Sequence, residues 1–169
     1  MTTEEQQIKE ALFQAFRDDH ATLGRGLYDL RLAIDGKNAS LAKTIAERIN
    51  NECGPHIAFE EKDFYPALDP FLSADEVTAL YEAHDDGYEL LASVLNIDDG
   101  EPITEERRGA LMASIEKMEA HVADCGELFG AMGGLSTAEQ RELLARLEGW
   151  RRQAPQWTDL RTQTPTPGL

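Results

Sequence analysis

Four histidines are the residues of this chain whose types and spacing could support chemistry. The chain has only His20, His56, His84 and His121, and Glu60 follows His56 by four residues. Imidazole nitrogens and carboxylate oxygens are metal ligands, and together they suit iron, zinc or manganese. Residues this far apart in sequence can share one metal only if the elements that carry them bring them together.

Those elements are predicted to be helices, because apolar residues recur at helical spacing along most of the chain. Ser73 with Glu76 and Ser136 with Glu139 have the spacing of capping boxes and mark two helix starts. The expected helices run over about 3–34, 40–68, 73–95, 104–132 and 136–153. The sequence therefore predicts an all-α protein, an up-down-up-down four-helix bundle with an additional C-terminal helix.

One domain is expected from a chain of 169 residues. We assign residues 1–153 to the helical bundle, with a core over about 10–132 and the extra helix over about 136–153. Residues 154–169 are rich in proline and threonine, and we expect them to form a flexible tail.

Composition excludes several classes of protein. The formal net charge of −16 opposes binding to nucleic acid and to anionic membrane surfaces. There is no apolar run of transmembrane length and no signal-peptide core near the N-terminus, so we predict a cytoplasmic protein. Cys53 and Cys125 are too few for a disulfide scaffold and form no CxxC pair.

Each histidine lies on the apolar stripe of its expected helix. His20 follows Phe16 by four residues and precedes Leu23 by three, and Glu60 lies one turn after His56. Each histidine also falls near the middle of its helix, so antiparallel neighbours would bring all four to one level. Buried imidazoles and a buried carboxylate are costly unless something satisfies them, and a metal does so.

The alternative is that these histidines are hydrogen-bonded core residues, which is the commoner role of a single inward histidine. The His-x-x-x-Glu spacing is also frequent on helices. Chance rarely places all four histidines of a chain inward, one on each long helix. A metal site is therefore the favoured interpretation.

The stretches that carry the four histidines resemble the hemerythrin-like, or HHE cation-binding, family over about residues 10–132. They read DDHATLGRGL, HIAFEEKDFYPAL, EAHDDGYELL and EAHVADCGELF. The resemblance implies a four-helix bundle that holds non-haem iron, as an oxo- or hydroxo-bridged di-iron centre, with zinc or manganese as alternatives. It also implies that Glu60 bridges the metals and that His20, His56, His84 and His121 are terminal ligands.

The chain departs from the family pattern of a lone His, HxxxE, HxxxH and HxxxxD at two places. The second histidine of HxxxH falls on Tyr88, and the final acid falls on Gly126. Tyr88 is a candidate phenolate ligand or a packing residue. Asp124, about 60° from His121 around the helix, is the better substitute acid, and a π-bulge near Gly126 could bring in Glu127 instead. Both acids could equally be solvated surface residues.

Two further residues have open roles. Glu61 is favoured as a surface charge, with the alternative that its carboxylate orients an imidazole N–H from outside the ligand set. Cys125, one turn after His121, is favoured as a small buried apolar residue over a residue of the site.

The expected function is that of a non-haem iron protein that binds, senses or reduces a small oxidant such as O2, peroxide or nitric oxide. A peroxide- or O2-reducing activity and a role in oxidative or nitrosative stress are consistent with that expectation. The alternative is a metal-responsive or metal-free helical interaction or scaffold module without turnover. The sequence assigns no catalytic residue, protein partner or oligomeric state.

Overall fold

The computed structural model describes residues 2–161, and all regular structure within that range is helical. The α-helices are α1 (Thr3–Asp35), α2 (Ala39–Phe59), α3 (Tyr65–Leu68), α4 (Ala74–Leu95), α5 (Glu105–Asp124), α6 (Leu128–Gly133), α7 (Thr137–Gln153) and α8 (Trp157–Leu160). A π-helix, η1 (Glu60–Phe64), and two 3-10 turns, η2 (Asp69–Phe71) and η3 (Cys125–Glu127), connect some of them. The prediction of an all-α fold is confirmed.

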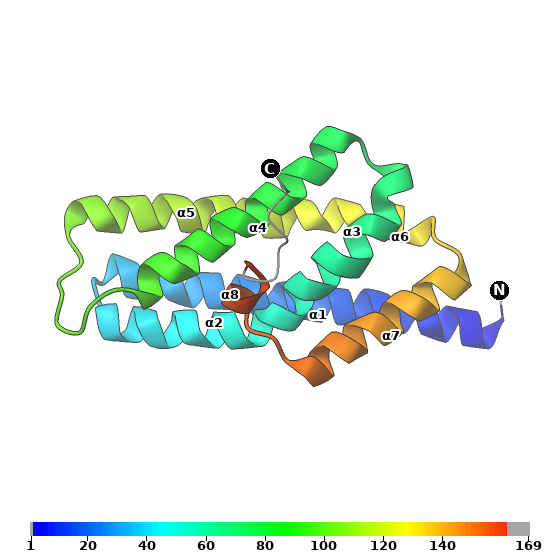
Figure 1. The fold of residues 1–169 in the computed structure, drawn as a ribbon, viewed down its shortest axis with the longest axis horizontal. Coiled ribbons are helices and arrows are strands. Elements are labelled where there is room, and N and C mark those ends of the chain that lie inside the picture. Colours follow the sequence, from blue (N-terminus) through cyan, green and yellow to red (C-terminus); the bar gives the residue numbers. More distant parts are fainter. Residues whose placement is uncertain (1, 162–169) are drawn as a thin grey trace, which may run out of the picture.

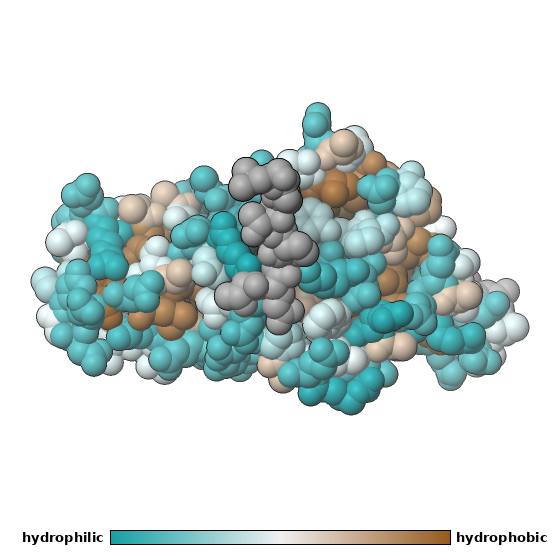
Figure 2. All heavy atoms as spheres, in the orientation of Figure 1, coloured by the Kyte–Doolittle hydropathy of each residue, from teal (hydrophilic) through white to brown (hydrophobic). Residues whose placement is uncertain are grey.

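Four long helices build the bundle (Figure 1). Helix α1 packs against α2 and α5, and α4 packs against the same two helices, so the four surround a common interior. Helix α7 lies across α1 and α2. The face drawn in Figure 2 is largely hydrophilic, as the net charge of −16 requires. Within residues 2–161, no helix combines the length and apolar composition needed to span a bilayer.

Side-chain caps fix several helix starts where the sequence places them. The Ser73 hydroxyl accepts a hydrogen bond from the Glu76 backbone N–H, and Ser136 accepts one from Glu139, each within a complete capping box. Both predicted boxes are therefore confirmed, and helices α4 and α7 begin one residue after their capping serines.

The interior consists of two apolar clusters with a polar layer between them. The first cluster includes Leu23 of α1 and Met118 of α5. The second includes Phe16 of α1 and Cys125, the residue of η3 that directly follows α5. On both helices the histidine falls between the two clusters, His20 after Phe16 and His121 after Met118. The histidines thus lie between the two apolar clusters.

The segment expected as one helix over 40–68 is interrupted by the π-helix. The Tyr65 N–H donates to the Glu60 carbonyl, five residues back, so this turn holds one residue more than an α-helical turn. Pro66 has no N–H for the Lys62 carbonyl, which prevents ordinary α-helical bonding through the turn. The π-bulge suggested near Gly126 is wrong, because that turn is a tighter 3-10 turn over Cys125–Glu127.

The expectation of a flexible tail from residue 154 is wrong for its first part. Helix α8 docks on the bundle, and Trp157 and Leu160 are only 3% and 5% exposed. The Asn50 side chain holds this segment: its amide donates to the Thr158 hydroxyl at 3.0 Å and its oxygen accepts the Thr158 N–H at 2.9 Å. The rest of the expected tail, residues 162–169, lies outside the described residues.

Two glycines on the bundle make room for this C-terminal segment. A Cβ atom on Gly54 of α2 would clash with the Pro155 carbonyl oxygen. A Cβ atom on Gly87 of α4 would lie 2.6 Å from Cη2 of Trp157 and 2.9 Å from Sδ of Met118. Close approach of α8 therefore requires the absence of a side chain at both positions.

We expect Gly87→Ala to destabilise the metal-free protein by about 1–3 kcal/mol, because the added methyl overpacks against Trp157. Gly109→Ala is the matched control, at an exposed position of α5 where nothing lies within 4 Å of the new Cβ. It should stabilise the protein by about 0.4–1 kcal/mol through a less flexible unfolded chain. Urea unfolding measures both changes, and a stabilising Gly87→Ala would contradict the packing of α8.

Candidate metal centre

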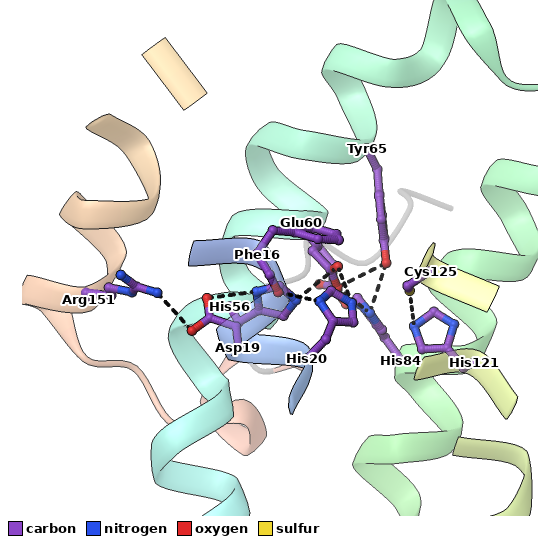
Figure 3. Close-up of polar contacts among 11 residues, drawn as sticks. Phe16, Asp19, His20, His56, Glu60, Tyr65, His84, His121, Cys125 and Arg151 are labelled. Carbon is purple, nitrogen blue, oxygen red and sulfur yellow. Dashed lines mark hydrogen bonds and ion pairs between the residues drawn. The ribbon is translucent and has the colours of Figure 1, made fainter. Parts of the chain in front are cut away.

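Five of the predicted site residues meet in the polar layer (Figure 3). They come from five different elements: His20 from α1, His56 from α2, Glu60 from η1, His84 from α4 and His121 from α5. His56, Glu60, His84 and His121 are buried, and His20 is nearly so. The four histidines, which the sequence places near the middle of their helices, do converge with Glu60 in the structure.

Glu60 lies between two pairs of histidines. Its Oε1 atom is 3.0 Å from Nε2 of His56 and 3.5 Å from Nε2 of His20. Its Oε2 atom is 3.0 Å from Nε2 of His84. The donors form two groups, His20–His56–Glu60 and Glu60–His84–His121, and within each group they lie within 4.8 Å of one another. One carboxylate oxygen faces each group, which is the arrangement a bridging ligand needs.

Three of the histidines are oriented by a hydrogen bond at Nδ1, the ring nitrogen that faces away from Glu60. The acceptors of the Nδ1–H groups are the Phe16 carbonyl for His20 at 2.8 Å, Asp19 Oδ2 for His56 at 3.1 Å and Glu61 Oε1 for His84 at 3.0 Å. When such a ring is neutral and Nδ1 carries the donated proton, its Nε2 lone pair faces Glu60 and can bind a metal. Glu61 thus contacts an imidazole nitrogen, as in the alternative to the surface charge that the sequence favoured.

Two atoms at the centre of the layer lack the partner that burial requires. His56 Nε2 and Glu60 Oε1 are buried and make no hydrogen bond, although they lie only 3.0 Å apart. Leaving buried polar atoms unpaired costs about 1–3 kcal/mol each. A metal ion accepts both lone pairs at once, so this donor set fits a metal.

The electrostatics of the metal-free layer favour a proton on one histidine of each pair, because carboxylates raise the pKa of both His56 and His84 despite burial. Burial opposes a charged His56, yet Glu60 and Asp19 outweigh it and raise the pKa of His56 to about 9. Burial also works against an ionised Glu60, but His56 and His84 hold its pKa well below the usual range. Burial, with the neighbouring His84, lowers the pKa of His121 to about 4. A proton on His56 thus supplies part of the charge that a bound cation would supply.

The three weaker ligand candidates lie away from Glu60. The Tyr88 ring packs beside the first apolar cluster with the Arg161 guanidinium 4.5 Å above its centre. Asp124 and Glu127 are exposed and belong to neither group of converging donors. The structure therefore brings together the four histidines and Glu60, and leaves these three residues outside that set.

Tyr65 is a residue of the site that the sequence analysis missed. Its hydroxyl donates to Glu60 Oε2 at 3.1 Å, lies 3.1 Å from His84 Nε2 and is fully buried. Regular α-helical spacing places Phe64 one turn after Glu60, whereas the π-turn places Tyr65 there. The Tyr65–Pro66 pair was the available signal, because a proline at this point disturbs the helix.

Asp19 and Cys125 complete the surroundings of the layer. Asp19 accepts from His56 and from Arg151 of α7, whose Nη2 lies 2.8 Å from Asp19 Oδ1. Cys125 is buried with its Sγ 3.6 Å from His121 Nε2. Burial raises the pKa of the Cys125 thiol far above its usual value, in keeping with the small apolar role expected for it.

A surface cleft reaches the second group. It has a volume of about 690 Å³, lies between the first half of α4 and the α5–α6 segment, and has His121 among its lining residues. The cleft therefore gives a small molecule an approach from solvent to the His121 end of the layer.

We expect Asp19→Asn to lower metal affinity about 10–100-fold, because the His56 ring loses the carboxylate that orients it. Asp18→Asn is the matched control: Asp18 is adjacent, exposed and bonded only to Gln14 among its described contacts. Competition with a coloured chelator measures both affinities. Equal affinities in the two variants would show that Asp19 does not support the site.

The low pKa of His121 predicts an acid-sensitive metal-free protein. Above pH 6.5 His121 is neutral in the folded and unfolded states. As the pH falls from 6.5 toward about 4, His121 binds a proton in the unfolded chain but stays neutral in the folded one. The free energy of unfolding therefore falls. The loss should be on the order of 1–3 kcal/mol. Chelator-treated His121→Phe should lose less stability over this interval in urea unfolding, and parallel pH profiles would contradict the assignment.

Comparison with known proteins agrees with this geometry. The family model described as the hemerythrin HHE cation-binding domain matches residues 11–132, a range that contains all five converging residues. No curated protein and no solved structure matches the chain. The matched range covers well over half of the 169 residues and confirms the resemblance seen in the sequence. The chain belongs to the hemerythrin HHE cation-binding domain family.

Proposed function

We propose that this chain is a non-haem iron protein that binds or reduces a small neutral oxidant, namely O2, peroxide or nitric oxide. The observation that carries the proposal is the position of Glu60. It presents one carboxylate oxygen to each of two histidine pairs, in a layer where His56 Nε2 and Glu60 Oε1 are buried without a hydrogen-bond partner.

Each group of donors is of a kind that suits iron. His20 and His56 would hold one metal with Glu60 Oε1, and His84 and His121 would hold the other with Oε2. Two imidazoles and one carboxylate, with further coordination positions open, form the donor set of non-haem iron sites that handle O2. Ferrous iron in such a site supplies electrons to a bound oxidant.

The chain's own residues supply orientation and dryness. Asp19, Glu61 and the Phe16 carbonyl hold the Nδ1 protons, so the imidazole rings are oriented before a metal arrives. The apolar clusters on both sides of the layer keep bulk water from the donors. A dry, preoriented site limits the competing hydrolysis and leakage reactions of a reactive metal.

The charge of the cleft favours neutral ligands over anions. Glu76, Asp124 and Glu127 line it, and Lys117 is the one basic residue among its lining side chains. An anion would enter this cleft against a negative potential, whereas O2, H2O2 and nitric oxide carry no charge. The role we give to Asp124 and Glu127 is thus electrostatic selection at the entrance, not metal ligation.

The test is metal content, measured by mass spectrometry after anaerobic loading with ferrous iron. We expect about two irons per chain, one for each donor group. His56→Ala should lose most of the iron, and Glu47→Ala, an exposed change on the same helix, should not. Consumption of added peroxide by the loaded protein then separates reduction of the oxidant from binding alone. A wild-type protein that takes up no iron would refute the proposal and favour a metal-free scaffold.

A further inference from the structure

The second group of donors contains a fourth candidate, the hydroxyl of Tyr65. Glu60 Oε2, His84 Nε2 and the Tyr65 oxygen form a nearly equilateral triangle with sides of 3.0, 3.1 and 3.1 Å. All three side chains are almost completely buried. Figure 3 shows the tyrosine entering the layer from the side of α3 and ending between Glu60 and His84.

The size of this triangle matches three donors around one metal. Three atoms that each lie about 2.1 Å from a metal, at right angles to one another, are separated by about 3.0 Å. The same donors in a tetrahedral site would lie about 3.4 Å apart, which is wider than the sides observed here. The spacing of the phenol oxygen from the imidazole and the carboxylate is therefore compatible with all three binding one metal.

The charge of the layer also calls for a second anionic donor. Glu60 is the only carboxylate in either group of converging donors, so the groups together supply one negative charge to as many as two divalent or trivalent ions. Asp19 and Glu61 stand outside the histidines rather than beside the metals. Burying excess positive charge is costly, and a phenolate reduces that excess by one unit.

Tyr65 also stands where the chain lacks family ligands. The positions that match the missing histidine and acid are Tyr88, which packs under Arg161, and Gly126, which has no side chain. Both of these positions lie on the side of the layer that holds His84 and His121. The π-turn adds one residue after Glu60 and so delivers Tyr65 to this same side.

We propose that Tyr65 is a metal ligand, binding as a phenolate to the ion held by His84, His121 and Oε2 of Glu60. The inference rests on the proposed iron site. In the metal-free protein Tyr65 keeps its proton, because burial and the nearby Glu60 raise its pKa. A bound cation reverses that preference: the phenol O–H bond breaks, the oxygen keeps the electron pair and bonds the metal, and the proton passes to solvent.

A phenolate makes the two metal positions unequal. The position of His20 and His56 has only neutral imidazoles and a shared carboxylate, whereas the position of His84 and His121 gains a full negative charge. An anionic ligand stabilises the more highly charged ferric state relative to the ferrous state. The cleft opens toward this same position. The inference therefore favours electron donation to an oxidant at the His84–His121 position over reversible O2 binding there.

The experiment compares wild type, Tyr65→Phe and Tyr88→Phe after iron loading and oxidation in air. Iron per chain is measured by mass spectrometry, and visible absorption with resonance Raman spectra detects ferric phenolate. Wild type and Tyr88→Phe should show the phenolate charge-transfer band and tyrosine ring vibrations. Tyr65→Phe should lose both while keeping the iron held by His20 and His56.

Because Tyr65 is buried, a second variant guards against a Tyr65→Phe chain that fails to fold. The chain has four tyrosines, and Tyr28→Phe, Tyr81→Phe and Tyr88→Phe combined leave Tyr65 alone. This triple variant should keep the phenolate band at wild-type intensity. Loss of the band in the triple variant, or its persistence in a folded Tyr65→Phe, would overturn the inference.

The outcomes also separate this inference from the function on which it rests. Iron-loaded wild type without phenolate features would overturn the role of Tyr65 and leave the iron site intact. Wild type that binds no iron would overturn both. Circular dichroism of the metal-free variants shows that each comparison is made between folded proteins.

Discussion

A buried carboxylate between histidines is the constraint on which the rest of this structure depends. Glu60 is 1% exposed, and its charge is tolerated because His56 and His84 approach its two oxygens at 3.0 Å. Those rings are held in turn by Asp19 and Glu61 on their far sides. The long helices must therefore meet at one height, and the apolar core is divided into two clusters by the layer they share.

The sequence predicts the parts of this arrangement that follow regular periodicity. Histidine spacing against Phe16, Leu23 and Met118 identifies the inward faces, and serine–glutamate pairs identify two helix starts, because both signals depend only on 3.6 residues per turn. Tyr65 escapes the same reasoning, since one extra residue in a π-turn rotates everything after Glu60. A regular period of 3.6 residues cannot predict where one turn holds an extra residue.

The C-terminal segment escapes prediction for a different reason. Proline and threonine content describes only the average composition of residues 154–169. Docking of α8 depends instead on the side chain of Trp157 and on two glycines that face the segment. Trp157 fits because Gly54 and Gly87 leave space on α2 and α4. Composition cannot reveal such a fit, because the three positions are distant in sequence and only the fold makes them neighbours.

The docking of α8 bears on the site itself. The Trp157 ring lies edge-on to His84, with centroids 6.1 Å apart, and Arg161 covers Tyr88. Trp157 packs on α4 against Gly87. Gly87 directly precedes Tyr88, the position where the family pattern has its second histidine. The chain thus closes that side of His84 with an indole, while Tyr65 approaches the same imidazole from α3. The C-terminal segment is thus packed tightly beside the position that lacks the family's second histidine, and the cleft beside His121 is left as an approach from solvent to this half of the layer.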